Sequence, residues 1–195
     1  MELVLQQVFN GIMLGSTYSL VALGLTLVFG ILNVSNFAHG NLYMLGAYIT
    51  FFLMVTVGIG FWPATILALV ILAIMGALVE MIVFRPLRDQ PHINGFIAAI
   101  GLMLFLETLV IIIWGPRGLR IPNPYPENID LMGITMSQQR LLVIGAAVVF
   151  IILLQLFIKK TTLGTTIEAV AQDREGASLV GINVNRISAL TFAVA

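Results

Sequence analysis

Long apolar runs alternate with short polar stretches along the chain, and this pattern sets the expected architecture. A helix that crosses a bilayer needs roughly 20 mainly apolar residues. Several runs reach or approach this length, and a further one begins near Ile187. The long runs are residues 8–32, 36–58, 62–84, 94–114 and 139–158. The pattern therefore predicts an all-α, polytopic transmembrane helical bundle with five full spanning segments and the start of a sixth.

The last apolar run has barely begun where the sequence stops, at "RISALTFAVA". We therefore expect one transmembrane domain, residues 1–195, that is incomplete at its C-terminus, with more helices in the full-length protein. Within this domain, residues 159–186 form the longest charged stretch. They are expected to form a loop between two spanning segments.

The composition supports a membrane location. The chain is 59% hydrophobic and 9% charged, whereas a soluble domain carries about 25% charged residues. A surface so poor in charge would aggregate in water, so the lipid bilayer is the expected solvent. The formal net charge of zero argues against a nucleic-acid partner. The absence of cysteine excludes disulfides and thiolate metal sites.

Lysine and arginine residues in the loops predict the orientation, because cytoplasmic loops carry more of them. Alternation of the spans places loops 85–94 and 159–186 on one side of the membrane. This side has more basic residues than the other, where the long loop 115–140 lies. We therefore expect the first side to be cytoplasmic and the N-terminus to be outside. The basic residues of the first side are Arg85, Arg88, Lys159, Lys160, Arg174 and Arg186.

A polar interruption, "NVSNFAHG" at residues 33–40, separates the first two apolar runs. Ser35 or Asn36 could cap the second helix. His39 could gate, relay protons or bind substrate, or it could be a hydrogen-bonded residue at a helix start. Irregular backbone at membrane depth is tolerated where it faces a cavity or is buried in protein. We therefore hypothesise that Asn36, His39 and Gly40 belong to a substrate pathway.

Two acidic residues lie in or near the apolar runs. Glu107 falls within the fourth run, where an ionisable group is costly and should face the bundle interior, pair, or stay protonated. It is either a pathway residue or a structural partner near the outer interface. Glu80 lies near the cytoplasmic end of the third run, shortly before Arg85. We expect Glu80 to extend its carboxylate into the interface, as long charged side chains do at helix ends.

The charged stretch 159–186 predicts a helical element outside the membrane. Thr165 or Thr166 could cap a short amphipathic helix whose first turn contains Glu168, where the helix dipole favours an acid. Such an element could dock on another protein or lie on the lipid surface.

Two glycines divide this element in the sequence. Gly176 is expected to interrupt the helix. Gly181 suits a C-terminal cap or a tight turn before the next apolar run.

No pattern for catalysis or metal binding is recognised. His39 and His92 are the only histidines, and no further ligands cluster with them. The sequence lacks a G-x-S-x-G nucleophile motif and a G-x-x-x-x-G-K-[ST] nucleotide-binding loop. We therefore expect no catalytic residue, no metal site and no cofactor.

Three sequence stretches, taken together and in this order, resemble the permeases of branched-chain amino acid ABC transporters. The first is "LGSTYSLVALGLTLVFGILNVSNFAHGNLYMLGAY", the second is "FRPLR" at residues 84–88, and the third is "LGTTIEAVAQDREGASLVGINVNRISALTFAVA". The resemblance extends from residue 6 to the end of the chain. It implies a multi-pass subunit of an ATP-driven importer in the bacterial inner membrane.

The resemblance also implies partners. A second, homologous permease would complete the pathway, cytoplasmic ABC ATPases would supply ATP hydrolysis, and a periplasmic binding protein would deliver a hydrophobic amino acid. Residues 167–182 would form the ATPase contact. The implied coupling residues are Glu168, Ala169, Gly176 and Gly181.

The coupling motif departs from the general pattern of ABC permeases, which is Glu-Ala-Ala, three residues and then glycine. Glu168 and Ala169 match its start, but Arg174 occupies the glycine position and Gly176 follows two residues later. The departure affects the register of the contact within the stretch and leaves its place in the chain unchanged.

Other transporter classes remain as alternatives. A permease of a related ABC importer for another small solute would have the same architecture. A secondary transporter driven by an ion gradient would need coupling carboxylates deep in the membrane, and Glu107 is the one the sequence offers. An intramembrane enzyme is disfavoured because no catalytic constellation is present.

Overall fold

The computed structural model describes all residues except 1, 33–35, 123–124, 126–127 and 132–133. Most of the described residues are helical. Four helices are long and apolar enough to cross a membrane, judged by length and composition. These spans are Gln6–Ile31, Phe61–Leu87, His92–Trp114 and Gln138–Lys160. The predicted all-α membrane bundle is therefore confirmed.

The four spans belong to α1 (Glu2–Leu32), α3 (Phe61–Val79), α4 (His92–Trp114) and α5 (Gln138–Lys160). α3 continues through a π-helical turn, Glu80–Phe84 (η2), and a short 3-10 turn, Arg85–Leu87 (η3). Each helix coincides with one of the predicted apolar runs, because an apolar run of this length satisfies its backbone hydrogen bonds in lipid only as a helix.

The second predicted run, residues 36–58, forms a shorter helix. α2 covers His39–Phe51 and continues through a π-helical turn, Phe52–Thr56 (η1). This helix is not one of the four spans that length and composition identify. The predicted sixth run forms α8 (Val184–Val194), a shorter apolar helix. The number of spanning segments therefore stays a prediction.

The long loop between α4 and α5 contains an element that the sequence analysis did not predict. β1 (Asn128–Leu131) pairs in antiparallel register with β2 (Ile134–Ser137), and Asn128 lies opposite Ser137. α5 begins directly after β2, with Ser137 as its N-cap. Outside this hairpin, the described part of the chain contains no strand.

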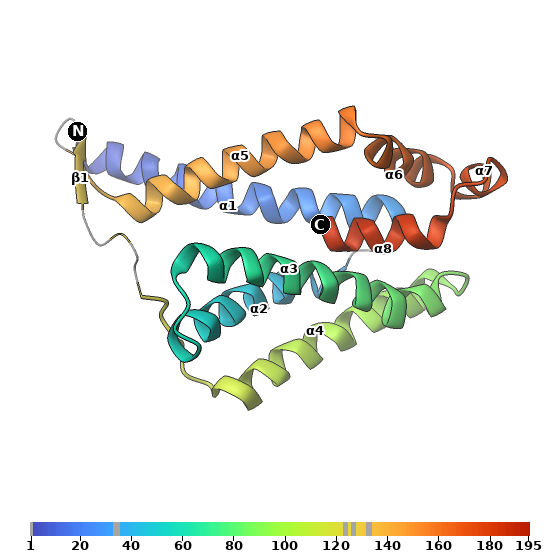
Figure 1. Ribbon diagram of the computed structural model, residues 1–195, viewed down its shortest axis with the longest axis horizontal. Coiled ribbons are helices and arrows are strands. Elements are labelled where there is room, and N and C mark those ends of the chain that lie inside the picture. The colour runs from blue at the N-terminus through green and yellow to red at the C-terminus, as the bar shows by residue number, and fades with distance from the viewer. Residues whose placement is uncertain (1, 33–35, 123–124, 126–127, 132–133) are drawn as a thin grey trace.

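The helices form two groups that lie side by side (Figure 1). α1 packs on α5 in one group, and α2 packs on α3 and α4 in the other. α8 contacts both α3 and α1 and so joins the two groups. Two short helices, α6 (Thr162–Gln172) and α7 (Arg174–Leu179), lie at one end of the bundle, and β1 lies at the opposite end (Figure 1).

The junction between α3 and α8 depends on a glycine. A Cβ atom at Gly76 would lie 2.3 Å from the carbonyl oxygen of Phe192. Gly76 is therefore needed for the two backbones to approach this closely. Next to this contact, Phe192 packs with Phe84 and Val28 in a small core that joins α8, η2 and α1.

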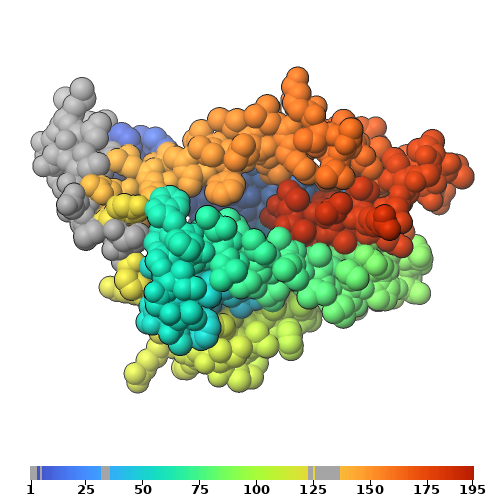
Figure 2. Space-filling view, in the orientation of Figure 1, coloured from blue at the N-terminus to red at the C-terminus, as the bar shows by residue number. Residues whose placement is uncertain are grey.

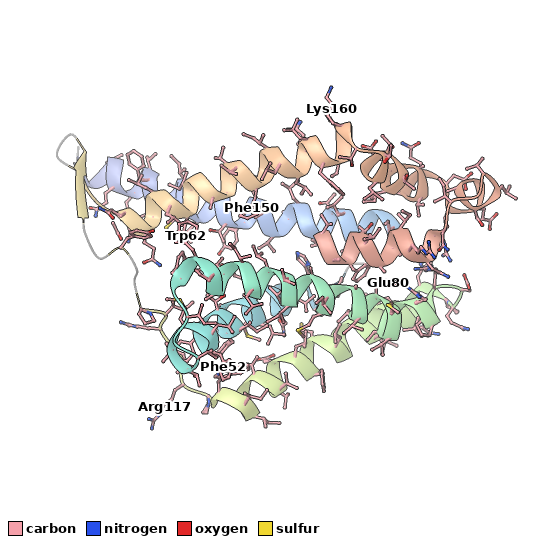
Figure 3. The ribbon with its side chains drawn as sticks, in the orientation of Figure 1. Phe52, Trp62, Glu80, Arg117, Phe150 and Lys160 are labelled. Atoms are coloured by element: carbon pink, nitrogen blue, oxygen red, sulfur yellow. The ribbon has the colours of Figure 1, made fainter. Side chains whose placement is uncertain are left out.

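Apolar side chains cover the outside of the bundle (Figure 3). Trp62 on α3 and Phe150 on α5 are about half exposed, and most residues of every long helix are accessible. A furrow separates α5 from α3 in Figure 2, with α1 at its base. In water such a surface would aggregate, so lipid or other membrane-embedded protein covers it.

Candidate functional site

The end of the bundle that holds α6 and α7 carries the sequence segment expected to contact an ATPase. α6 begins earlier than predicted: Thr161 is its N-cap, and the Thr161 side chain accepts a hydrogen bond from the Gly164 backbone at 3.0 Å. The prediction that Thr165 or Thr166 caps this helix is therefore wrong. Thr161 can serve as the cap because residue 164 is glycine. A Cβ atom at Gly164 would lie 2.3 Å from the Ile158 carbonyl oxygen and would prevent this close approach.

The break between the two short helices lies at Asp173, so the prediction that Gly176 interrupts the helix is wrong. Asp173 has extended backbone and serves as the N-cap of α7, accepting a hydrogen bond from the Gly176 backbone at 2.9 Å. A Cβ at Gly176 would lie 2.5 Å from the Asp173 carboxylate. Gly176 therefore leaves room for the cap, and Asp173 makes the break.

α7 ends in the tight turn that Gly181 was expected to form. Gly181 has a φ of 88°, a left-handed value that glycine adopts without strain. The turn exposes two apolar side chains, Leu179 (88% accessible) and Val180 (76%). These two residues are named here the α7 tip. They were not singled out in the sequence, because two apolar residues at a helix end are usually buried and the sequence does not show their exposure.

The other two predicted coupling residues lie on α6. Glu168 is exposed and Ala169 is half-buried. Neither is in the α7 tip, since α6 and α7 are separated by Asp173.

The short helices share a hydrophobic core with the end of α1. Ile31 of α1 packs with Ile167 and Val170 of α6 and with residues of α7 and α8. A Cβ at Gly30 would lie 3.6 Å from the Cβ of Ala171, so α6 is in ordinary contact with the last turns of α1. The core at this junction consists of Ile31, Ile167, Val170, Ala177 and Ile187.

The predicted pathway segment directly follows this end of α1. Asn36 is almost fully buried, and its carbonyl oxygen Oδ1 accepts a hydrogen bond from the Ala38 backbone at 3.2 Å. Its amide nitrogen Nδ2 has no partner among the described residues. Asn36 therefore organises a turn before α2 and does not cap that helix directly. Ser35, the other expected cap, lies outside the described residues.

His39 and Gly40 open α2 in different surroundings. The His39 ring lies against α1, because a Cβ at Gly24 would approach His39 Nε2 to 2.8 Å. Gly40 is exposed, and no other group lies within 4 Å of where its Cβ would be. The structure brings Asn36 and His39 to the junction of α1 and α2 and leaves Gly40 on the surface of this chain.

One polar residue of α2 escaped the sequence analysis. Asn41 donates a hydrogen bond from Nδ2 to the Met103 carbonyl oxygen of α4 at 2.7 Å. The bond joins residues 62 positions apart. It ties α2 to α4 close to the pathway segment.

Glu107 lies apart from these residues. Its side chain is exposed on α4, and it has no hydrogen-bond or ion-pair partner in the described part of the chain. Of the three expectations for Glu107, facing the interior and pairing are not met within this chain. A carboxylate in this position gives no support to an ion-coupled pathway through the described helices.

Glu80 differs most from its prediction. The expectation that its carboxylate extends into the interface is wrong, because Glu80 is fully buried. It accepts a hydrogen bond from Arg85 at 2.7 Å and another from Arg88. Burial lowers the pKa of the Arg88 guanidinium, and the Glu80 carboxylate acts in the opposite direction. Figure 3 shows Glu80 at the end of the bundle near α8.

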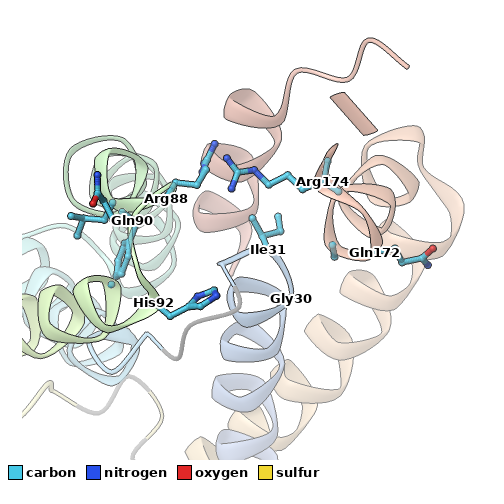
Figure 4. Close-up of a pocket in the computed structure, with 12 residues that line it drawn as sticks. Gly30, Ile31, Arg88, Gln90, His92, Gln172 and Arg174 are labelled. Carbon is cyan, nitrogen blue, oxygen red and sulfur yellow. The ribbon is translucent and has the colours of Figure 1, made fainter. Parts of the chain in front are cut away.

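A cavity of about 160 Å³ lies between α1, the start of α4 and α6 (Figure 4). Gly30 and Ile31 form one wall, and Arg88, His92 and Arg174 contribute polar groups. Arg88 and Arg174 also line a second cavity beside α7 and α8. Figure 4 shows their guanidinium groups close to one another between the two helix groups.

No set of three or more His, Asp or Glu side chains that could hold a metal ion occurs among the described residues. The arrangement at this end is a packed junction with two cavities, both lined by Arg88 and Arg174.

The chain matches a known protein family over almost its whole length. The family described as "Branched-chain amino acid transport system / permease component" matches residues 7–195. No solved structure matches the chain significantly.

Three relatives illustrate the similarity. The high-affinity branched-chain amino acid transport system permease protein BraD of Pseudomonas aeruginosa is 35% identical over 203 residues, covering 97% of this chain and 66% of BraD. Its counterpart LivH of Escherichia coli K12 is 35% identical over 210 residues, with the same coverage. The permease protein LivM of Salmonella typhimurium is 25% identical over 200 residues, covering 91% of this chain and 47% of LivM. The chain thus spans 66% of the length of BraD and LivH.

Proposed function

Because this chain belongs to the family of branched-chain amino acid transport permeases, we propose that it is a membrane-spanning subunit of an ATP-driven importer of branched-chain, hydrophobic amino acids in a bacterial inner membrane. It would form part of the translocation pathway and would have no active site of its own. ATP binding and hydrolysis would occur on cytoplasmic ABC ATPases. A periplasmic binding protein would deliver the amino acid.

A second, related permease would complete the pathway. The chain is similar both to LivH and to LivM of Salmonella typhimurium, two permeases of one organism. Similarity to both agrees with a pore built from two homologous subunits. The large apolar surface that this chain exposes is consistent with such a neighbour in the membrane.

The contact between α6 and the end of α1 is the observation that carries the coupling proposal. Ile31 packs on α6 and α7, and Asn36 follows it by five residues along the chain. A force applied to α6 and α7 would therefore act on the end of α1 and on the turn that contains Asn36. The bundle would alternate between inward-open and outward-open states, and the energy would enter as different affinities of the ATPases for these two states.

We propose that the α7 tip, together with Glu168, Ala169, Gly176 and Gly181, forms or positions the ATPase contact within the coupling loop 159–186. Leu179 and Val180 are among the most exposed apolar side chains of the protein. They stand at the end of the bundle that the basic residues predict to be cytoplasmic. An apolar knob of this kind fits a groove on another protein.

The test is copurification of the full-length protein with its ATPases from membranes. The double substitution Leu179→Asp/Val180→Asp places two charges at the α7 tip without touching the core of α6 and α1. We expect it to abolish copurification of the ATPase while the protein remains in the membrane. The matched control is Thr162→Asp/Thr165→Asp, which adds two charges to exposed positions of α6 and should retain the ATPase.

Two outcomes would count against the proposal. If no ATPase copurifies with the unaltered protein, the importer itself is in question. If an ATPase binds both double variants equally, the importer stands but the contact lies elsewhere.

A further inference from the structure

We propose that Glu80 is a positioning residue for coupling: its buried carboxylate holds Arg85 and Arg88 so that the end of α3 is tied to α8 and moves with it. The inference rests on the proposed function, since it describes how motion of the cytoplasmic helices would reach the membrane-spanning bundle. Glu80 would act through the two arginines, without contact to the transported amino acid.

Glu80 forms two ion pairs at the end of α3. Glu80 lies in the π-helical turn η2, and its side chain is completely inaccessible, whereas the Arg88 side chain is 6% and the Arg85 side chain 30% accessible. One carboxylate thus binds two guanidinium groups from the turn that follows α3. Burial of a charge is costly unless it is paired, so removal of Glu80 would leave two arginines without their anion.

Both arginines extend to the beginning of α8. Arg88 donates to the Asn185 side-chain oxygen at 2.6 Å, and Arg85 donates to the Asn185 backbone oxygen at 3.2 Å. Arg88 is 97 residues and Arg85 is 100 residues from Asn185 along the chain. The carboxylate therefore fixes the two donors, and the donors fix α8.

The start of α8 in turn packs with α6 and α7. Asn183 caps it, and its side chain accepts a hydrogen bond from the Arg186 backbone at 3.1 Å. Ile187 of α8 shares a core with Ala177 of α7 and Ile167 of α6. Displacement of α6 and α7 would accordingly carry the start of α8, and through Arg85 and Arg88 the end of α3.

A direct link from the same turn to α7 is weak by comparison. Arg174 lies 3.4 Å from Asp89, whose side chain is 90% accessible. An exposed ion pair of this kind contributes little. Arg174 also lies near Arg88, and the two like charges oppose each other. We infer that the end of α3 moves together with α8. Because the Arg174–Asp89 pair contributes little, a substitution of Asp89 is a suitable control for a substitution of Glu80.

The experiment measures coupling in the full-length permease assembled with its partner subunits in lipid vesicles. Amino acid taken up and ATP hydrolysed are measured in the same vesicles, for equal amounts of assembled complex. In Glu80→Gln we expect uptake per ATP hydrolysed to fall by about fivefold or more. Fivefold is about the lower end of the effects that coupling between two sites produces. Asp89→Asn removes a carboxylate that follows η3 and pairs with Arg174, and it should leave the ratio unchanged.

Arg88→Lys covers the case in which Glu80→Gln does not assemble. It keeps the positive charge, but a single ammonium group replaces the planar fork that binds Glu80 and Asn185 together. We expect an assembled Arg88→Lys complex that hydrolyses ATP with reduced uptake per ATP. A purely structural ion pair would instead lower the amount of complex and leave this ratio intact.

The failures can be distinguished. Absence of ATP-driven uptake by the unaltered protein would refute the proposed function. Coupled uptake by the unaltered protein together with an unchanged ratio in an assembled Glu80→Gln or Arg88→Lys variant would overturn the role of Glu80 alone.

Discussion

Single polar side chains hold distant parts of this protein together, and Asn41 gives the simplest case. Its hydrogen bond to the Met103 carbonyl joins α2 to α4 at 2.7 Å. Interhelical hydrogen bonds in membrane proteins contribute roughly 0.6–2 kcal/mol. We therefore expect Asn41→Ala to lower the free energy of unfolding by about 1 kcal/mol, measured by denaturation in detergent micelles.

The control for Asn41 is Ser16→Ala. Ser16 is also a polar residue of an apolar helix, but its hydroxyl donates to the Ile12 carbonyl within α1. Its loss removes no contact between helices, so the unfolding free energy should stay nearly unchanged. Equal destabilisation by both substitutions would show that the bond between α2 and α4 contributes nothing of its own.

Sequence reasoning at the residue scale succeeded where the chemistry is local. Gly181 was expected in a tight turn and has the left-handed backbone that such a turn needs. The pairing of Glu80 was missed because its partners are Arg85 and Arg88, five and eight residues away around a turn that follows α3. The sequence around Glu80 is compatible with an interfacial carboxylate and with a buried one, and only the geometry of that turn distinguishes them.

At the scale of elements, the contact of α3 with α8 depends on one missing methyl group. A Cβ at Gly76 would meet the Phe192 carbonyl at 2.3 Å, a backbone atom that cannot move away by a side-chain rotation. We expect Gly76→Ala to force α3 and α8 apart and to destabilise the protein by about 1–3 kcal/mol, the usual cost of overpacking a core. The measurement is again the unfolding free energy in detergent.

Gly101→Ala provides the matched control on α4. Gly101 is helical and exposed, and no other group lies within 4 Å of where its Cβ would be. Alanine should therefore be tolerated there and should favour the helix, since glycine is the poorer helix former by up to about 1 kcal/mol. Similar losses at both positions would contradict the close approach of α3 and α8.

Helix ends could be predicted where an apolar run ends, but not where the choice of capping residue sets the end of the helix. α4 and α5 agree with the predicted runs within two residues at each end. The short helices were misjudged, because Thr161 caps α6 instead of Thr165 or Thr166, and the break between the helices lies at Asp173 instead of Gly176. Several threonines in this stretch qualify as caps, and only the packing of Gly164 against α5 selects Thr161.

At the scale of the whole molecule, the proposed coupling and pathway segments meet at one end of the bundle. The core around Ile31 joins α1 to α6, α7 and α8, and the buried amide of Asn36 follows that core along the chain. These connections could not be derived from the sequence, because the two segments are separated by four helices. Their proximity explains how a cytoplasmic partner could act on a pathway without contacting it.

The last prediction tests whether this junction contains the pathway. Asn36 has a buried amide nitrogen with no partner among the described residues, and His39 packs on Gly24 of α1. In the full-length protein, we expect Asn36→Ala/His39→Ala to lower amino-acid uptake by about tenfold, since loss of one hydrogen bond to a charged group is worth roughly 1.5–3 kcal/mol. Membrane level and ATPase copurification should be unchanged.

Asn94→Ala is the control, an asparagine near the start of α4 that lines neither cavity and has no buried unpaired amide. It should transport as the unaltered protein does. Full uptake by Asn36→Ala/His39→Ala would remove both residues from the pathway and restrict the junction to mechanical coupling. Reduced uptake with normal ATPase binding would place the end of α1 next to the route of the amino acid, as the shared position of the two segments predicts.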